Sequence, residues 1–412
     1  MVHFKQLENG IRLVVKKMDG LMSVTMGVLV GTGACYETDA EDGISHFIEH
    51  MMFKGTKTRS SFTISDEMDR IGAQMNAFTG KDLTCYYAKS TTDNAEKAFE
   101  ILADLFLNST FPEEEMVKEK GVIIEEINMN EDTPDDLCLD LVGEAYYGKG
   151  GYGRNILGPR KNVSGFTGAD VRKYMASRYT TDNIVVAMAG NIDIELAEDM
   201  TRKYFSALKP SAADKREVKV ERRHGSLVRY KDIEQIHLAL AYPSFKRGER
   251  LYDAAQIMNS VLGGSMSSRL FQKVREELGL AYTVYSYNTA YAETGTLCVY
   301  AGVNAENYMR SVEAIKNCIE DIKRKDISSE EFARGKEQLK ASSIFAQEST
   351  SSQMLLYGKE MLYNNKIYDF GERIEKVNAV TFDDLAEAID LSFDSAGMAA
   401  AVVGKVKNPL VI

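Results

Sequence analysis

The sequence predicts an α+β protein with two homologous halves, each a mainly antiparallel sheet with helices packed on one face. Short runs of β-branched residues alternate with stretches of helical periodicity along the whole chain. A similar order of elements starts again in the second half, after a polar linker. With 412 residues, 44% of them hydrophobic, the chain can bury a sizeable core in each half. We therefore expect an N-terminal half at 1–210, a linker at 211–222 and a C-terminal half at 223–412.

The internal repeat is weak but sustained. Gly190 follows the apolar run 184–189, and Gly404 follows the apolar run 399–403, at a spacing of 214 residues. The helical stretch that begins at Asn94 has a counterpart in the second half. Because strands and helices recur in the same order, the two halves should fold alike.

The N-terminal half begins with strands. Runs rich in β-branched and aromatic residues predict four strands, at 11–17, 22–30, 75–79 and 83–88. Asp19-Gly20 is a turn signal between the first two, and Gly80-Lys81-Asp82 joins the last two. A helix with an apolar stripe follows from Asn94.

Between the second and third of these strands, residues 46–50 read His-Phe-Ile-Glu-His and predict a metal-binding helix. On a helix His46 and His50 stand one turn apart on one face, with Glu49 beside them. The opposite face is apolar and would be buried; it carries Ile44, Phe47, Ile48 and Met51. Neutral imidazole is a good zinc ligand, and a carboxylate beside a metal-bound water can take its proton. The alternative is a chance pair of surface histidines, which five histidines in the whole chain disfavour.

Zinc needs a third protein ligand if one position is to stay open for water. The acid-rich stretch 113–130 has apolar residues at roughly helical spacing. Within it Glu119 and Glu126 are seven residues apart, so they differ by only about 20° around the helix axis and face the same way. Glu125 is turned about 100° away from Glu126 and is the weaker candidate.

With this spacing the chain resembles the insulinase/pitrilysin family of zinc peptidases, in the subgroup of mitochondrial processing peptidase and its short bacterial relatives. In that family a glutamate ligand follows the HxxEH motif at the spacing seen here between His50 and Glu126, 76 residues. An auxiliary glutamate stands seven residues before the ligand, as Glu119 does. The resemblance implies one Zn²⁺ per chain, bound by His46, His50 and Glu126. It also implies that Glu49 is the general base and that Glu119 orients the ligands or the water.

The C-terminal half lacks the metal motif. At the matching place the chain reads Leu262-Gly263-Gly264-Ser265, and the two histidines of this half, His224 and His237, have no ligand spacing. We expect both histidines to be structural or exposed. The catalytic centre therefore belongs to the first half.

Arg275 and Tyr282, seven residues apart, are the chemically suggestive pair of the second half. From the residues alone they are a solvated arginine and a strand tyrosine. The resemblance implies instead that the two halves enclose a cavity and that this pair reaches across it to the substrate. There a cation and a phenol can stabilise the developing oxyanion. Both halves would then be needed for catalysis, with hinge motion about the linker admitting the substrate.

Two further groups of residues concern the substrate. Asn76, Ala77, Phe78 and Thr79 could be a plain sheet edge. The resemblance implies that this edge lies beside the zinc and accepts the substrate as an added β-strand. Asp136 and Asp140 could be an acidic helix surface, whereas in the processing peptidases acids at about these places favour arginine near the scissile bond.

Composition excludes several classes of protein. No apolar run approaches the roughly 18 residues of a membrane span, and the N-terminus has neither a signal-peptide core nor transit-peptide character. We expect a cytoplasmic protein with no membrane partner. The net charge of −11 argues against nucleic acid as a partner. Five cysteines without CxxC spacing predict reduced thiols, and the GxGxxG match at 148–153 follows no strand, so we expect a loop.

The sequence therefore favours a zinc-dependent endopeptidase that cleaves peptides or unfolded segments, with a preference for basic residues near the cleavage site. One alternative is a non-catalytic scaffold, like the respiratory-complex core subunits that share this fold. Another is a subunit that needs a partner chain. In the mitochondrial relatives, a second chain with a long glycine-rich loop captures the substrate. The glycine-rich stretch here, Gly263-Gly264-Ser265, is short, so this chain does not resemble that partner. A homodimer is therefore expected over an obligate heterodimer.

Overall fold

The computed structural model describes residues 1–214, 216–393 and 397–406, which form two compact units. Unit 1 contains Met1–Ile127, Asn155–Glu217 and Phe345–Asp369. Unit 2 contains Asn128–Arg154, Val218–Ile344 and the described part of 370–412. Each unit combines one sheet with helices, so the predicted α+β class is confirmed.

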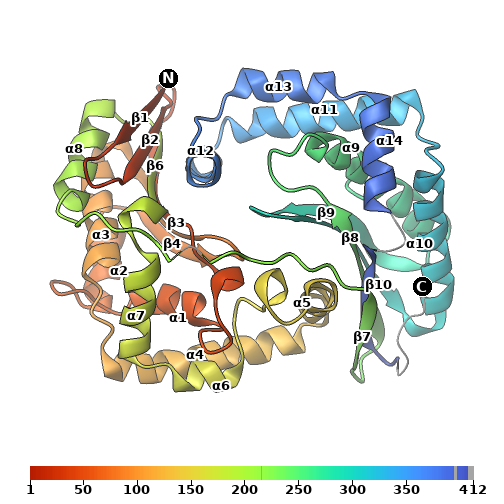
Figure 1. The fold of residues 1–412 in the computed structure, drawn as a ribbon, viewed down its shortest axis with the longest axis horizontal. Coiled ribbons are helices and arrows are strands. Elements are labelled where there is room, and N and C mark those ends of the chain that lie inside the picture. The colour runs from red at the N-terminus through yellow and green to blue at the C-terminus, as the bar shows by residue number, and fades with distance from the viewer. Residues whose placement is uncertain (215, 394–396, 407–412) are drawn as a thin grey trace. The chain divides into compact units, whose positions relative to one another are not determined.

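The sheet of unit 1 has six strands and is mainly antiparallel (Figure 1). In spatial order the strands are β1 (Val2–Gln6), β2 (Arg12–Lys17), β6 (Ile184–Gly190), β3 (Ser23–Val30), β5 (Thr84–Thr91) and β4 (Gln74–Thr79). Only β2 and β6 pair in parallel. The strand β4 pairs with β5 alone, so it is an edge of the sheet.

The sheet of unit 2 repeats this arrangement with five strands. Their order is β7 (Gly225–Tyr230), β11 (Ala399–Gly404), β8 (Gln235–Ser244), β10 (Gly295–Asn304) and β9 (Ala281–Ala290). Again one pair, β7 with β11, is parallel and the others are antiparallel. The shared strand order confirms that the chain has two homologous halves.

Matching helix caps support the same repeat. Thr167 and Asp170 form a capping box at the start of α7 (Gly168–Arg178). Thr381 and Asp384 form the same box at the start of α14 (Phe382–Ser392). In each box the threonine side chain accepts from the third helical amide while the aspartate accepts from the threonine amide, which fixes the helix start.

One face of the unit 1 sheet is covered by helices of the first half. They are α1 (Ile44–Met52), α2 (Ser61–Arg70), α3 (Ala95–Asn108), α4 (Glu113–Asp132), α6 (Arg160–Gly165), α7 and α8 (Ile194–Phe205). Side chains alternate along each strand, so Leu13 and Val15 of β2 join this core while Val14 points to the other face.

A helix from the second half of the chain, α12 (Thr350–Asn364), covers the other face of the unit 1 sheet. Figure 1 shows it in blue beside β2 and β6. Met354, Tyr357 and Met361 pack in one buried cluster with Val14, Leu29, Val185 and Ala187. A β-carbon on Gly358 would lie 2.7 Å from Leu29, so the helix approaches the strands closely. The unit 1 sheet therefore has helices on both faces, where the sequence predicted one.

Unit 2, in turn, includes a helix from the first half of the chain. α5 (Pro134–Tyr147) packs on β7, β8 and β11, where the Cys138 thiol lies 3.4 Å from the carbonyl oxygen of His237. The remaining helices are α9 (Tyr252–Leu262), a π-helical segment Phe271–Glu277, α10 (Tyr308–Lys323), α11 (Ser329–Ala346), α13 (Phe370–Ala379) and α14. The compact units therefore do not follow the predicted division at 211–222, because each unit includes one helix from the other half of the sequence.

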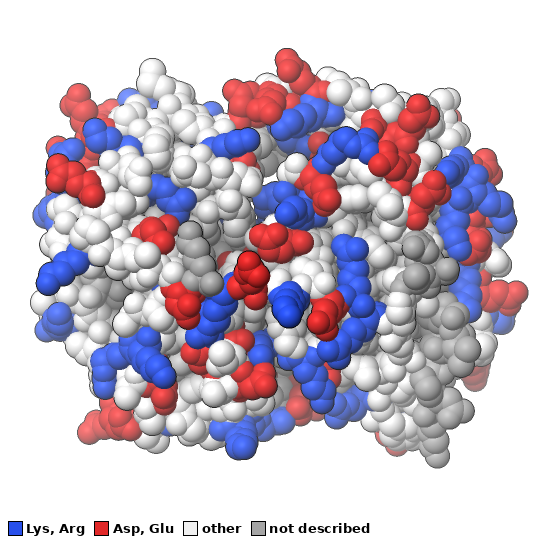
Figure 2. Space-filling view, in the orientation of Figure 1, with Lys and Arg blue, Asp and Glu red and all other residues white. Residues whose placement is uncertain are grey.

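Other sequence predictions can be located in the structure. The GxGxxG match follows the end of α5: Gly148, at φ +81°, caps the helix, and Gly151–Gly153 form a short 3₁₀ turn, so it is not a dinucleotide-binding loop. All five cysteines are free and buried. Among the described residues, no helix is both long enough and apolar enough to span a membrane. On the face seen in Figure 2, basic and acidic side chains are interspersed.

The contribution of α12 to unit 1 can be tested by truncating a buried side chain. Met354→Ala should lower the free energy of unfolding by about 2–5 kcal/mol, because it leaves a cavity against β3 and β6. Urea denaturation measures the loss. Ser352→Ala, an exposed change on the same helix, is the control. Equal stability of the two variants would contradict the packing described.

Candidate metal centre

The start of α1 is fixed by a buried carboxylate, Glu37. Its Oε2 accepts from the amide of Gly43 at 2.7 Å and its Oε1 accepts from the amide of Ser45 at 2.8 Å. Negative charge at a helix N-terminus is stabilised by the free amides and the helix dipole. Burial raises the pKa of Glu37 to about 7, against the opposing effect of these hydrogen bonds. Gly43 has φ +94°, a conformation that favours glycine.

The apolar face of α1 is buried as its spacing predicts. Ile44, Phe47, Ile48 and Met51 are at most 1% exposed and belong to the main core of unit 1. This packing fixes the rotation of the helix about its axis. His46, Glu49 and His50 consequently lie on the side turned away from the core.

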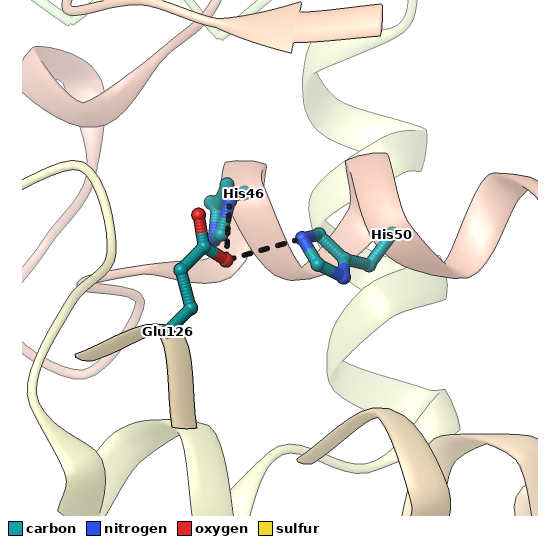
Figure 3. Close-up of side chains that lie close together, drawn as sticks. All are labelled: His46, His50 and Glu126. Carbon is teal, nitrogen blue, oxygen red and sulfur yellow. Dashed lines mark ion pairs between the residues drawn. The ribbon is translucent and has the colours of Figure 1, made fainter. Parts of the chain in front are cut away.

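Glu126 of α4 meets both histidines (Figure 3). Its Oε2 lies 3.5 Å from Nε2 of His46 and 3.4 Å from Nε2 of His50. Donors bound tetrahedrally to zinc at about 2.0–2.1 Å are about 3.4 Å apart, so the three atoms fit one zinc ion. Among the described residues this is the group of His, Cys, Asp and Glu side chains able to hold a metal.

The two histidines have different electrostatic surroundings. Burial and the neighbouring His50 lower the pKa of His46 to about 4, which favours the neutral imidazole that binds metal. Burial also acts to lower the pKa of His50, but hydrogen bonds to Glu126 and Glu119 outweigh it and raise that pKa. The buried Nδ1 of His46 has no hydrogen-bond partner in the described part of the chain. Only His50 therefore has a carboxylate behind its ring.

Glu119 lies behind His50, where the sequence placed it. Its Oε2 is 3.1 Å from Nδ1 of His50, and its Oε1 is 2.6 Å from Nζ of Lys54. A carboxylate that accepts from Nδ1 fixes the tautomer in which Nε2 is free for the metal. Sequence reasoning missed Lys54, which lies two residues past the end of α1. A basic residue one turn after the second histidine was the available signal.

Glu49 is held by Thr79 of β4, whose Oγ1 donates to Oε2 of Glu49 at 2.5 Å. Burial raises the pKa of Glu49 above its usual value, while the bond from Thr79 acts in the opposite direction. The sequence placed Thr79 among the substrate-binding residues and gave no sign that it contacts the base.

The rest of the predicted substrate edge lies where expected on the sheet. Asn76, Ala77 and Phe78 belong to β4, the edge strand, and Asn76 is exposed. The side-chain oxygen of Asn76 accepts from the amide of Ala77 at 2.8 Å. The position of this edge agrees with the prediction, and its use by a substrate stays a prediction.

The other predicted site residues belong to unit 2. Arg275 lies in the π-helical segment, with its guanidinium 5.6 Å from the ring of Tyr282, whose side chain is 77% exposed. The structure therefore brings this pair together, though its role toward a substrate is untested. Asp136 and Asp140 lie on α5, Asp136 exposed and Asp140 half-buried. Burial and the neighbouring Asp135 raise the pKa of Asp136.

In unit 2 the helices that correspond to α1 and α4 are joined without a metal group. Ser260 of α9 donates a hydrogen bond to Gln338 of α11. Of the histidines in this half, His237 is buried with Nδ1 2.7 Å from the hydroxyl of Tyr300, and His224 is exposed. Both agree with the structural or exposed roles expected of them.

Comparison with known families agrees with this geometry. The family model described as Insulinase (Peptidase family M16) matches residues 13–160, and the model described as Peptidase M16 inactive domain matches residues 165–339. The chain belongs to the insulinase family of peptidases. The metal cluster of this insulinase-family protein lies in the first match.

Relatives of similar length carry the name of zinc protease. The uncharacterized zinc protease YmxG of Bacillus subtilis is 43% identical over 380 residues, covering 91% of this chain and 92% of that protein. An uncharacterized zinc protease of Rickettsia felis is 34% identical over 402 residues, covering 97% of each. With the fit of the His46, His50 and Glu126 donors, these names identify zinc as the cofactor.

Solved structures share the fold. A protease from Helicobacter pylori has a TM-score of 0.90 at 22% identity and covers 98% of this chain and 99% of that one. A peptidase M16 inactive domain from Pseudomonas fluorescens has a TM-score of 0.91 at 20% identity, with 100% of both chains covered. At these identities they support the fold alone.

Removing the charge behind His50 should weaken zinc binding. Glu119→Gln should lower zinc affinity about 10–100-fold, because the neutral amide loses the ion pair with Lys54 and supports Nδ1 less well. Competition with a chromogenic chelator measures the affinity. Glu125→Gln, an exposed change on the same helix, is the matched control. The assignment fails if the two variants bind zinc equally.

Proposed function

We propose that this insulinase-family protein is a zinc-dependent endopeptidase that hydrolyses peptides or unfolded segments. The observation that carries the proposal is the cluster of three donor atoms, with Glu49 on the same helix between the two histidines. His46, His50 and Glu126 are the proposed ligands. Their number leaves a fourth position for water, as in catalytic rather than structural zinc sites.

The proposed chemistry assigns proton transfer to Glu49. Bound zinc lowers the pKa of a water and polarises the scissile carbonyl. Glu49 accepts a proton from the attacking water and returns it to the leaving amine. Partial burial of Glu49 suits this task, since burial brings the pKa of a carboxylate closer to neutral pH. Glu119 holds the ring of His50 throughout.

Arg275 and Tyr282 are the proposed donors to the developing oxyanion. Their side chains lie beside each other, which supports joint action on one oxygen atom. Because the pair belongs to unit 2, the assignment requires both units for full activity.

The substrate is proposed to bind as an added strand along β4, at Asn76, Ala77, Phe78 and Thr79. Backbone pairing gives affinity without strict sequence preference. A preference for a basic residue near the scissile bond, as in processing peptidases, would come from Asp136 and Asp140.

The competing functions are a non-catalytic scaffold and a subunit that depends on a partner chain. We favour a homodimer acting alone in the cytoplasm, and light scattering of the purified 46.0 kDa chain would measure its mass in solution. A non-catalytic scaffold does not account for a carboxylate held beside three metal-binding donor atoms.

The decisive test is hydrolysis of an internally quenched, arginine-containing peptide by the purified protein. Glu49→Gln should lower kcat by a factor of about 10² or more, since it removes the general base, and should keep the zinc. Chelation should abolish cleavage by the native chain, and added Zn²⁺ should restore it. Zinc-loaded native protein that cleaves no member of a diverse peptide library would favour the scaffold or the missing partner.

Specificity has its own test. Asp136→Asn combined with Asp140→Asn should lower kcat/KM for a peptide with arginine near the scissile bond by about 10-fold, through loss of charge pairing. The same peptide with norleucine in place of arginine is the control and should be cleaved equally by both proteins. If both peptides lose activity in proportion, the two carboxylates do not select arginine.

A further inference from the structure

The hydroxyl of Thr79 makes its short contact with the carboxylate of Glu49. Oγ1 of Thr79 lies 2.5 Å from Oε2 of Glu49 and 3.5 Å from the carbonyl oxygen of Ser45. A hydroxyl has one hydrogen to donate, and a charged acceptor at short distance forms the stronger bond. The hydrogen of Thr79 therefore goes to Glu49.

The backbone that carries this hydroxyl is itself fixed. Thr79 pairs with Thr84 across β4 and β5. The carbonyl oxygen of Gly80, the next residue, accepts from the amide of Ala34 at 3.2 Å. A β-carbon on Gly33 would lie only 2.4 Å from that oxygen, so the two segments approach as closely as glycine allows. Thr79 thus presents its hydroxyl from a rigid strand end.

We propose that Thr79 is a positioning residue that holds Glu49 in the orientation needed to take a proton from the attacking water. The inference rests on the proposed function, in which Glu49 is the general base. A glutamate has three rotatable side-chain bonds, and without a partner its half-buried carboxylate would sample several rotamers. Because Thr79 also ends β4, one residue fixes the base relative to the strand proposed to bind the substrate.

Two substitutions at Thr79 separate the hydroxyl from the shape of the side chain. Thr79→Val keeps the branched shape and removes the donor, and kcat should fall on the order of 10–100-fold with KM within about twofold. Thr79→Ser restores the donor and should recover most of the lost kcat. Zinc affinity, measured by competition with a chelator, should be unchanged in both variants.

Thr84→Val is the matched control, because it makes the same change in the residue paired with Thr79. The Thr84 hydroxyl donates to the carbonyl oxygen of Thr32 at 2.9 Å and not to Glu49. It should lower stability without a specific loss of kcat. A loss of kcat equal to that of Thr79→Val, or no recovery with Thr79→Ser, would overturn the inference.

A second measurement does not depend on peptidase activity. In a double-mutant cycle on the urea unfolding of the metal-free protein, Thr79→Val should cost more stability in the native background than in Glu49→Ala. Equal costs would show that the two side chains are not coupled, and the inference fails. If the native protein cleaves no peptide, the proposed function fails, and this cycle alone decides whether Thr79 holds Glu49.

Discussion

The site depends on placing polar and charged side chains in a half-buried position on one short helix. One face of α1 is completely buried. The opposite face is therefore turned toward solvent, α4 and β4. Partly desolvated imidazoles and carboxylates are costly unless each has a partner. The partners are supplied at three points along the helix: Glu37 at its start, Thr79 beside Glu49, and Glu119 with Lys54 behind His50. Apart from Nδ1 of His46, the local geometry is the one in which these groups satisfy each other.

The described part of the second half of the chain has the same topology without half-buried metal-binding side chains. Its sheet has the same strand order, with the parallel pair in the same place. Where α1 and α4 meet through histidines and a carboxylate, α9 and α11 meet through a neutral bond from Ser260 to Gln338. A neutral pair costs less to desolvate and needs no further support. The fold therefore does not require the metal centre.

Sequence periodicity predicts which side chains lie together on one face of a regular helix. The spacing of His46, Glu49 and His50, and of Glu119 and Glu126, places each set on one face, and the structure agrees. The class of fold and the repeat were also accessible from pattern. Glu37 was missed because it acts from outside the helix, where no period relates it to the ligands, and Lys54 was missed because it follows the end of α1. The exchange of α5 and α12 was missed because a repeat in sequence does not say which sheet a helix covers.

The packing of α12 on the unit 1 sheet affects the position of Glu49 as well as the core. The turn after β4 contains Asp82, which is buried and accepts a hydrogen bond from the hydroxyl of Tyr363 on α12 at 2.8 Å. The same turn follows Thr79 directly. A helix supplied by the second half of the sequence thus supports the strand end that contacts Glu49. The N-terminal half carries all the proposed ligands, yet its residues alone would lack both the cover of one sheet face and this support. The cover of that sheet face and the support of this strand end therefore depend on α12, from the second half of the chain.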